Sequence, residues 1–303
     1  MPEIIGFIGL GQMGGRMVRR FLAAGYTVHA YDTSRAALDA AVGHGAAAAG
    51  SVAEVARASE VVILSLPTPA VVREVVLGPG GIRETGGARC VIDHSTTGLE
   101  VEREVGAALA AAGVEVIDAP VSGGVRGAEN GTLSIMVATP HDVLERRRPI
   151  LERVGTKIVP VGTEPGQAQV MKLVNNMISS AAMIATAEGM VLGVKAGLDP
   201  TTMLEVLNSS TGKNSHTEDK FPRFVLPRTF NFGFTIGLLD KDVRLGLQMA
   251  KTLNVPMPVI SGAEQLWSVA LAEGGPDQDM TSIVKYFEKW AHVEVTGGPG
   301  TKK

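Results

Sequence analysis

Cysteine is nearly absent from this sequence: Cys90 is the only one among 303 residues. A single cysteine excludes an intramolecular disulfide framework and a zinc site built from several thiolates. The spacing of the six histidines does not indicate a metal site either, because no two of them lie three or four residues apart. We therefore expect no metal site.

Neither sign of charge dominates the chain. Lys and Arg number 28 and Asp and Glu number 31, which leaves a net charge of −3. This balance argues against a nucleic-acid or polybasic membrane-surface protein. No uninterrupted apolar run reaches the roughly 20 residues that cross a bilayer, and Met1-Pro2-Glu3 lacks the basic start of a secretory signal. The sequence predicts a soluble cytoplasmic protein without membrane or nucleic-acid partners.

The first half of the chain alternates short apolar runs with segments of helical spacing. The apolar runs predict buried strands at 4–8, 27–31, 61–66 and 88–93, followed by 115–117, 133–137 and 157–161. Helices are predicted at 13–24, 34–42, 51–58, 70–76 and 100–112, and Asn130-Gly131 predicts a turn. Alternation of this kind is typical of βαβ units, so we predict an α/β fold with a Rossmann-type, doubly wound, mostly parallel sheet.

The β pattern ends near Gly166. From Gln167 to Ala196 apolar residues recur every three or four positions, which predicts one long helix that is buried on most sides. Shorter helices are predicted at 200–207, 239–253, 259–273 and 280–291. We expect a Rossmann-type domain over 1–164, an all-helical domain over 165–295 that starts with a long interdomain helix, and a flexible tail over 296–303.

A glycine motif, Gly9-Leu10-Gly11-Gln12-Met13-Gly14, lies between the first predicted strand and the first predicted helix. There the three glycines allow a tight turn, close approach of a pyrophosphate and close helix–strand packing, and the helix N-terminus offers N–H donors to phosphates. Asp32, at the end of the second strand, is placed to accept hydrogen bonds from the adenosine ribose. Its carboxylate would repel a 2′-phosphate, so we predict NAD as the cofactor; the nearby Arg35 leaves NADP open.

Two polar features of the later sequence suggest chemistry. In Ser122-Gly123-Gly124, a hydroxyl is followed by two residues without Cβ, which exposes backbone N–H groups to an anion. Lys172 interrupts the long apolar helix, and Asn176 follows one turn later on the same face. A lysine in that setting either extends to solvent or exchanges a proton with a substrate.

Four segments, found in the same order, resemble the β-hydroxyacid dehydrogenase family, which contains 3-hydroxyisobutyrate dehydrogenase and tartronate semialdehyde reductase. They are Phe7–Met17, Asp118–Gly124, Gly166–Asn176 and the pair Lys241-Asp242. The resemblance covers nearly the whole chain. It implies a Rossmann-type domain joined by a long helix to a helical domain, with the active site in the cleft between them.

The resemblance also implies an activity: NAD-dependent interconversion of a small 3-hydroxy acid and its semialdehyde. It implies that Lys172 is the general acid/base and that Asn176 supports it. The implied substrate residues are Ser122, Gly123, Gly124 and Lys241, and the implied cofactor residues beyond the glycine motif and Asp32 are Leu66, Pro67, Thr96 and again Lys241. One departure is visible, because the segment 95–98 ends in Gly98 where the family pattern has a proline.

Several alternatives remain at this stage. 3-Hydroxyisobutyrate is the first substrate to consider, but the segment 286–295 looks closer to tartronate semialdehyde reductases. An imine reductase on the same scaffold is disfavoured by Lys172, and a dinucleotide-sensing module by the Lys172–Asn176 pair. Phosphogluconate dehydrogenases share the motifs but carry a larger helical domain. The apolar helix at 167–196 also predicts a homodimer or homotetramer.

Overall fold

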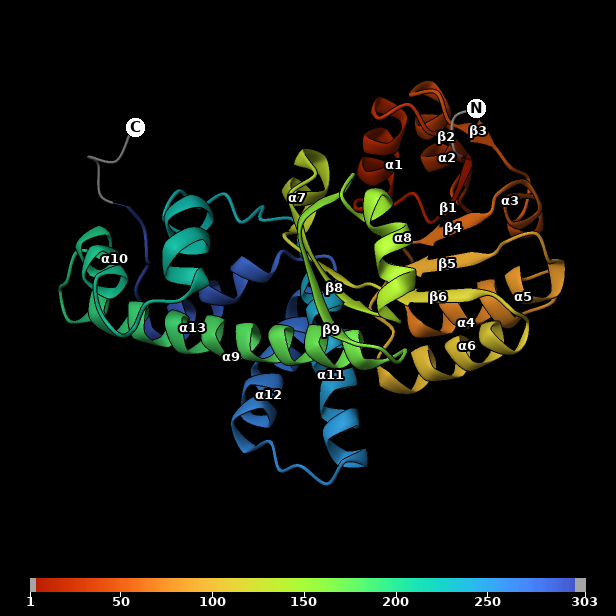
Figure 1. Ribbon diagram of the computed structural model, residues 1–303. Coiled ribbons are helices and arrows are strands. Elements are labelled where there is room, and N and C mark those ends of the chain that lie inside the picture. The colour runs from red at the N-terminus through yellow and green to blue at the C-terminus, as the bar shows by residue number, and fades with distance from the viewer. Residues whose placement is uncertain (1–3, 298–303) are drawn as a thin grey trace. The chain divides into compact units, whose positions relative to one another are not determined.

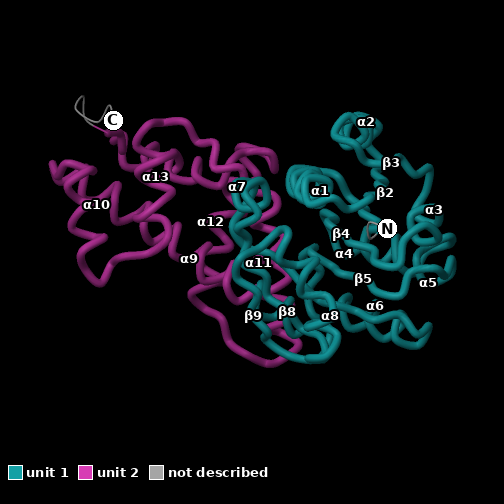
Figure 2. The backbone as a smooth tube through the Cα atoms, turned by 45° about the horizontal axis from the view of Figure 1, so that its top comes forward, with its two compact units in different colours: residues 1–172 teal, residues 173–303 magenta. Residues whose placement is uncertain are grey.

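The computed structural model describes residues 4–297. The chain divides into two compact units, 1–172 and 173–303 (Figure 2). The division falls inside a single long helix, so each unit is described by itself. The expected domain boundary at 164/165 remains a prediction.

Unit 1 is built on a nine-stranded sheet (Figure 1). Its main path runs β3-β2-β1-β4-β5-β6-β8-β7, and β9 pairs with β8. The strands are β1 Ile4–Ile8, β2 Thr27–Tyr31, β3 Ala47–Ala48, β4 Val61–Leu64, β5 Cys90–Asp93, β6 Glu115–Asp118, β7 Val121–Ser122, β8 Leu133–Ala138 and β9 Gly155–Gly162. All pairs from β3 to β6 are parallel, whereas β8 is antiparallel to β6 and β7. The predicted Rossmann-type, mostly parallel sheet is confirmed.

Both faces of this sheet are covered by helices, as alternating side chains show. Phe7 and Ile63 belong to a buried cluster with residues of α1, α2 and α8, and Ile8 and Leu64 to a second cluster with residues of α3, α4, α5 and α6. The covering helices are α1 Gly14–Ala23, α2 Arg35–Gly43, α3 Val52–Ala58, α4 Pro69–Leu77, α5 Ile82–Thr85, α6 Leu99–Ala111, α7 Gly124–Asn130 and α8 His141–Leu151. Strands buried on both faces explain the near-continuous apolar runs in the sequence.

Side-chain caps fix where several of these helices begin. Ser34, Ser51 and Thr68 each accept a hydrogen bond from the backbone N–H three residues further on. These residue types are favoured at helix starts because they satisfy N–H groups that have no acceptor within the helix. The predicted bounds therefore lie within a few residues of the observed ones.

Several short elements were not predicted. The segment between β6 and β8, for which the sequence predicts no strand or helix, contains β7 and α7. Gly131 takes the left-handed conformation with φ 69°, ends α7 and forms the predicted turn before β8. The two-residue β3 and the four-residue α5 are too short to give a periodic signal.

The longest element is α9, Gln167–Lys195, which is 29 residues long. By length and mean hydropathy alone, α9 could cross a membrane. Counting only uninterrupted apolar residues in the sequence does not single it out. In its most apolar stretch, 44% of the residues are buried inside the structure. The core helix of a soluble protein meets the same criteria.

Unit 2 is helical, as predicted. After its part of α9 it contains α10 Pro200–Asn208, the π-helix η1 His216–Val225, α11 Ile236–Thr252, α12 Pro258–Gly274, the 3-10 helix η2 Met280–Ile283 and α13 Val284–Ala291. The segment 280–291 is thus two elements rather than one helix, and η1 was not predicted. Trp267 is fully buried in this unit. Of the predicted tail, residues 298–303 lie outside the described residues.

Candidate active site

The glycine motif of unit 1 forms a tight turn between β1 and α1. Gly9 has φ 96°, and its N–H donates to the Tyr31 carbonyl over 3.0 Å. A Cβ on Gly14 would run into the Gly9 carbonyl oxygen, so this position requires glycine. A Cβ on Gly11 would meet no protein atom within 4 Å. Two of the glycines therefore serve the turn, and Gly11 leaves open space beside the helix start.

The other motif residues surround the N-terminus of α1. Leu10 is buried, Gln12 is exposed, and Met13 stands at the N-cap without a side-chain hydrogen bond to the helix. The N–H groups of a first helical turn have no intrahelical acceptor and carry positive potential. An uncapped helix start next to open space at Gly11 fits the pyrophosphate of a dinucleotide.

Asp32 holds the glycine motif to the start of α2. Its Oδ2 accepts from the Leu10 N–H over 2.6 Å, and its Oδ1 accepts from the Ser34 N–H over 2.7 Å. The carboxylate thus has a structural role that the sequence did not reveal. Each carboxylate oxygen can accept a second hydrogen bond, so the predicted contact with a ribose remains compatible with this geometry.

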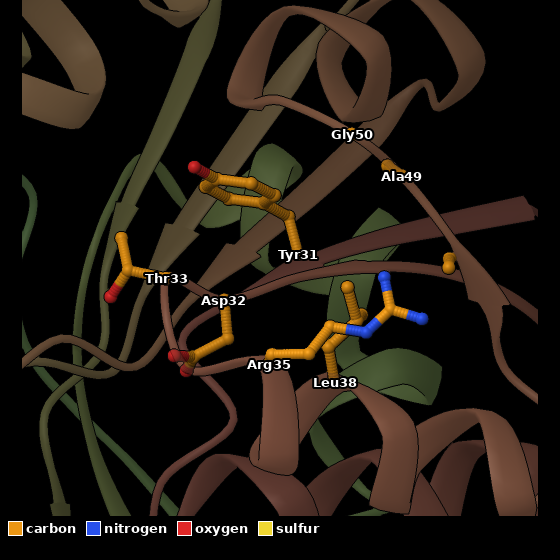
Figure 3. Close-up of a pocket in the computed structure, with 8 residues that line it drawn as sticks. Tyr31, Asp32, Thr33, Arg35, Leu38, Ala49 and Gly50 are labelled. Atoms are coloured by element: carbon orange, nitrogen blue, oxygen red, sulfur yellow. The ribbon is translucent and has the colours of Figure 1, made fainter.

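A pocket of about 350 Å³ opens beside Asp32. It is lined by Tyr31, Asp32, Thr33, Arg35, Leu38, Ala48, Ala49 and Gly50 (Figure 3). Apolar and polar side chains face it from β2, β3 and α2, which suits an adenosine. The Arg35 guanidinium is exposed and pairs with the Asp39 carboxylate over 2.9 Å.

The segments after β4 and β5 are joined by a hydrogen bond. The Leu66 N–H donates to Ser95 Oγ over 2.9 Å, while Pro67 is exposed and Thr96 is half-buried. Gly98 has φ 79° and its N–H points to Gln169 Oε1 at 3.4 Å. Proline can provide neither this φ nor an N–H, which accounts for the departure from the family pattern at this position.

The predicted carboxylate-binding residues lie where β7 turns into α7. Ser122 pairs with Ser134 of β8, while Gly123 and Gly124 have φ 126° and 62°. These positive φ values require residues without Cβ. Because α7 begins at Gly124, its first N–H groups lie beside Ser122, which suits an anion.

Helix α9 carries both predicted catalytic residues. Lys172 is half-buried, and Asn176 is buried with 8% of its surface exposed. A spacing of four residues places them on one face of the helix, about one turn apart.

In unit 2, Asn176 belongs to a hydrogen-bonded group centred on Asp242 of α11. Asn176 Nδ2 donates to Asp242 Oδ2 over 2.6 Å, and Lys241 Nζ lies 3.1 Å from Asp242 Oδ1. Asn175 Nδ2 donates in turn to Asn176 Oδ1 over 3.0 Å. The sequence singled out Asp242 only as a member of the pair Lys241-Asp242, and the structure shows that it links two of the predicted site residues.

Burial favours the neutral forms of two titratable side chains on or next to β5. Burial lowers the pKa of His94 to about 4, and its Nδ1 lies 2.7 Å from the Ala119 carbonyl oxygen. Burial raises the pKa of the Cys90 thiol to about 12. Over residues 4–297, no group of three or more His, Cys, Asp or Glu side chains is arranged to hold a metal ion.

Comparison with known proteins identifies the family. Residues 4–162 match the model of the NAD-binding domain of 6-phosphogluconate dehydrogenase, and residues 166–287 match that of the NAD-binding domain of NADP-dependent 3-hydroxyisobutyrate dehydrogenase. The chain belongs to the β-hydroxyacid dehydrogenase family. It is therefore an NAD(P)-dependent oxidoreductase.

Similar proteins match it over nearly their whole length. 2-(Hydroxymethyl)glutarate dehydrogenase of Eubacterium barkeri is 39% identical, over 97% of this chain and 98% of its own. 3-Hydroxyisobutyrate dehydrogenase of Pseudomonas aeruginosa is 37% identical, over 93% of this chain and 98% of its own. The solved 3-hydroxyisobutyrate dehydrogenase of Mycobacterium tuberculosis, described with L-serine, has a TM-score of 0.85 and 32% identity over 95% of this chain and 99% of its own.

Proposed function

We propose that this enzyme interconverts a small 3-hydroxy acid and its semialdehyde, with 3-hydroxyisobutyrate as the first candidate substrate. The observation that carries the proposal is the placement of Lys172 and Asn176 on one face of α9, with Asn176 hydrogen-bonded to Asp242. A proton donor and a fixed amide are what carbonyl reduction requires once a hydride donor is bound.

Lys172 is assigned the proton transfer. The bound nicotinamide supplies a hydride to the carbonyl carbon or takes one from the alcohol carbon. In reduction, the Lys172 ammonium gives its proton to the carbonyl oxygen; in oxidation, the neutral amine takes the hydroxyl proton. Asn176 holds the reacting oxygen or orients the lysine, and Lys241 contributes positive charge near the substrate.

Ser122, Gly123 and Gly124 are assigned the substrate carboxylate. Gly123 and Gly124 have positive φ values, and the first N–H groups of α7, which begins at Gly124, have no acceptor within the helix. The named substrates of the two similar relatives, 3-hydroxyisobutyrate and 2-(hydroxymethyl)glutarate, share a carboxylate next to a carbon that carries CH₂OH. They differ in the other substituent of that carbon. The proposed enzyme therefore recognises the carboxylate and the CH₂OH group.

Tartronate semialdehyde reduction is the second candidate. The 2-hydroxy-3-oxopropionate reductase of Escherichia coli is 32% identical over 95% of this chain, and its substrate is also a carboxylate with an aldehyde one carbon away. Imine reductases in the comparison are 20% identical or less and share only the fold. A non-enzymatic dinucleotide-binding module remains the least favoured reading, because it gives no role to Lys172 and Asn176.

The geometry of unit 1 supports the assignment of the pyrophosphate and adenosine residues, and the family resemblance that of the nicotinamide residues. We assign the pyrophosphate to the turn Gly9–Gly14, the adenosine ribose to Asp32, and the nicotinamide half to Leu66, Pro67, Thr96 and Lys241. NAD is the proposed preferred cofactor because of the Asp32 carboxylate. The exposed Arg35 beside the pocket would allow NADP as well.

We also propose a homodimer or homotetramer of cytoplasmic location, with domains 1–164 and 165–295. Ile178 and Leu192 are 62% and 71% exposed, and with Ala185 between them they are spaced by seven residues along α9. Such spacing forms an apolar stripe suited to another helix. Leu192→Lys is expected to lower the mass measured by light scattering toward that of the monomer; an unchanged mass would exclude this stripe as the contact.

The decisive experiment replaces Lys172 with Met, which keeps most of the length of the side chain and removes the ammonium group. NADH binding, followed by fluorescence titration, is expected to stay within about threefold, while turnover of every 3-hydroxy acid falls by roughly 10²- to 10⁴-fold. The panel contains 3-hydroxyisobutyrate, L-serine, glycerate and 2-(hydroxymethyl)glutarate. Turnover within tenfold of the unaltered enzyme would refute the role of Lys172. NADH binding without turnover of any of these acids by the unaltered enzyme would favour the binding module.

A further inference from the structure

Gln169 is fully buried at the start of α9, one turn before Lys172. Its Oε1 accepts from the Thr97 N–H over 2.9 Å, and its Nε2 donates to the Ser95 carbonyl over 3.3 Å. The same Nε2 donates to Asp118 Oδ1 over 2.8 Å. One carboxamide therefore ties the helix that carries Lys172 to the ends of both β5 and β6.

Asp118 completes this junction from the opposite side. It is the last residue of β6, has no exposed surface, and begins the segment that leads to Ser122. Its Oδ2 accepts from the N–H groups of Gly166, Ala168 and Gln169, at 2.8, 3.0 and 3.3 Å. A carboxylate distant in sequence thus caps α9, whose own first residues include no Ser, Thr, Asp or Asn.

Two further carboxyl groups, Asp93 and Glu102, form hydrogen bonds with the segment 95–98. Asp93 Oδ1 accepts from the Ser95 N–H over 2.7 Å, and Glu102 Oε2 accepts from Thr97 Oγ1 over 2.9 Å. Glu102 also hydrogen-bonds to Asp93, and burial together with the charges of Asp93 and Asp118 raises its pKa well above the usual value. A proton on Glu102 removes the repulsion that two neighbouring buried carboxylates would exert on each other.

We propose that Gln169 and Asp118 are positioning residues, which fix Lys172 relative to the segments 95–98 and 118–124. The inference rests on the proposed function, because it gives these residues an effect on turnover only if Lys172 transfers the proton. The segment 95–98 carries Thr96, assigned to the cofactor. The segment 118–124 carries Ser122, assigned to the substrate carboxylate, and the start of α9 carries Lys172. Shared hydrogen bonds make their relative positions depend on one amide and one carboxylate.

This arrangement explains why position 169 holds an amide. The site needs an acceptor facing the Thr97 and Gly98 N–H groups and a donor facing Asp118, and a glutamine side chain offers both. A carboxylate at this position would face Asp118 without a proton between them, and an apolar side chain would leave the Asp118 Oδ1 and the Thr97 N–H buried without a partner.

The experiment compares three variants. Two carry a single exchange, Gln169→Met or Asp118→Asn, and the third combines Asp118→Asn with Gln169→Glu. In the combined variant the introduced amide donates to the introduced carboxylate, so every bond described here is restored except the one to the Ser95 carbonyl. Both single variants are expected to lower kcat by roughly ten- to a hundredfold, as misplacement of a reacting group does. NADH affinity and KM should change by less than about threefold, and the combined variant should recover most of kcat.

Thr139→Val is the matched control. Thr139 is also buried in unit 1 and donates one hydrogen bond, over 2.8 Å, to the Val116 carbonyl of β6. Loss of this one hydrogen bond should lower Tm and leave kcat unchanged. The inference is overturned if kcat of Gln169→Met stays within twofold, or if the combined variant restores Tm without restoring kcat.

Lys172→Met is measured beside these variants to separate the two claims. If it keeps turnover, the proposed function fails and this inference fails with it. If Lys172→Met is inactive while Gln169→Met is fully active, the positioning role alone is refuted.

Discussion

Asn176 Nδ2 donates a hydrogen bond to Asp242 Oδ2 over 2.6 Å, and this bond joins α9 to α11 within unit 2. Both side chains are buried, with 8% and 3% of their surfaces exposed. The Asp242 carboxylate also lies 3.1 Å from Lys241 Nζ, so one anion orients an amide and a cation assigned to the site.

Replacing Asp242 with Ala should therefore disturb both neighbours. The Asn176 amide loses its acceptor and Lys241 loses its counter-charge, and we expect kcat/KM to fall by roughly 10²-fold or more, equivalent to about 3 kcal/mol of transition-state stabilisation. Steady-state kinetics with 3-hydroxyisobutyrate measure the effect.

Asp240→Ala serves as its control, because Asp240 is a buried carboxylate on the same helix that pairs with Arg244 over 2.7 Å. This change should reduce stability and leave kcat/KM within about threefold. Equal kinetic losses in both variants would show that α11 matters only through its stability.

The glycine motif offers a pair of substitutions with opposite expected effects. In Gly14→Ala the new methyl group meets the Gly9 carbonyl oxygen, and we expect the free energy of unfolding to fall by about 1–3 kcal/mol. In Gly11→Ala the methyl group enters open space, so stability should hold while NADH affinity falls by tenfold or more. Thermal unfolding and NADH titration of the two variants test this; unchanged NADH affinity in Gly11→Ala would place the pyrophosphate elsewhere.

Arg35 allows a test of cofactor choice. Arg35 lines the pocket beside Asp32, and its guanidinium forms an exposed ion pair with Asp39. Because exposed pairs are weak, a 2′-phosphate can recruit this side chain. Arg35→Gln should weaken NADP binding by roughly tenfold and leave NAD binding unchanged. Asp39→Asn, which frees the guanidinium, should not weaken NADP; an equal loss for both cofactors in Arg35→Gln would contradict this reading.

The raised pKa of Glu102 predicts how stability depends on pH. The folded state holds the Glu102 proton more tightly than the unfolded chain does, so this group stabilises the fold fully below about pH 4.5 and loses its contribution as pH rises toward the folded pKa. Asp118, with a pKa raised by burial to about 7, acts in the same direction between about pH 4 and 7. His94 and His216, whose pKa values burial lowers to about 4, act oppositely between pH 4 and 6.5.

Glu102→Gln isolates one of these groups, because the amide donates to Asp93 at every pH. The difference in Tm between this variant and the unaltered protein should grow in favour of the variant from pH 5 to pH 8. Glu104→Gln, an exposed change on the same helix that removes the ion pair with Arg73, should show no such trend over this range. A constant difference for Glu102→Gln would mean that Glu102 does not hold its proton in the folded protein.

The sequence alone determined the strand and helix alternation, the glycine motif and the long helix with Lys172 and Asn176, because these depend on local periodicity and close spacing. Ser122 was found from the two glycines that follow it. Lys241 was found only through the family resemblance, since a charge pair carries little local signal. The elements β7, α7 and η1 were not predicted, because each is short or irregular and gives no periodic pattern in the sequence. Their form depends on what packs against them.

Only the tertiary structure showed what Asp32, Asp118, Gln169 and Asp242 do. Asp32 and Asp118 stand at strand ends, where a pattern cannot tell a ligand-binding carboxylate from one that caps backbone N–H groups. Gln169 and Asp118 are 51 residues apart, and Asn176 and Asp242 are 66 apart. Hydrogen bonds between such distant residues follow from how the sheet and helices pack, and no periodicity along the chain records them.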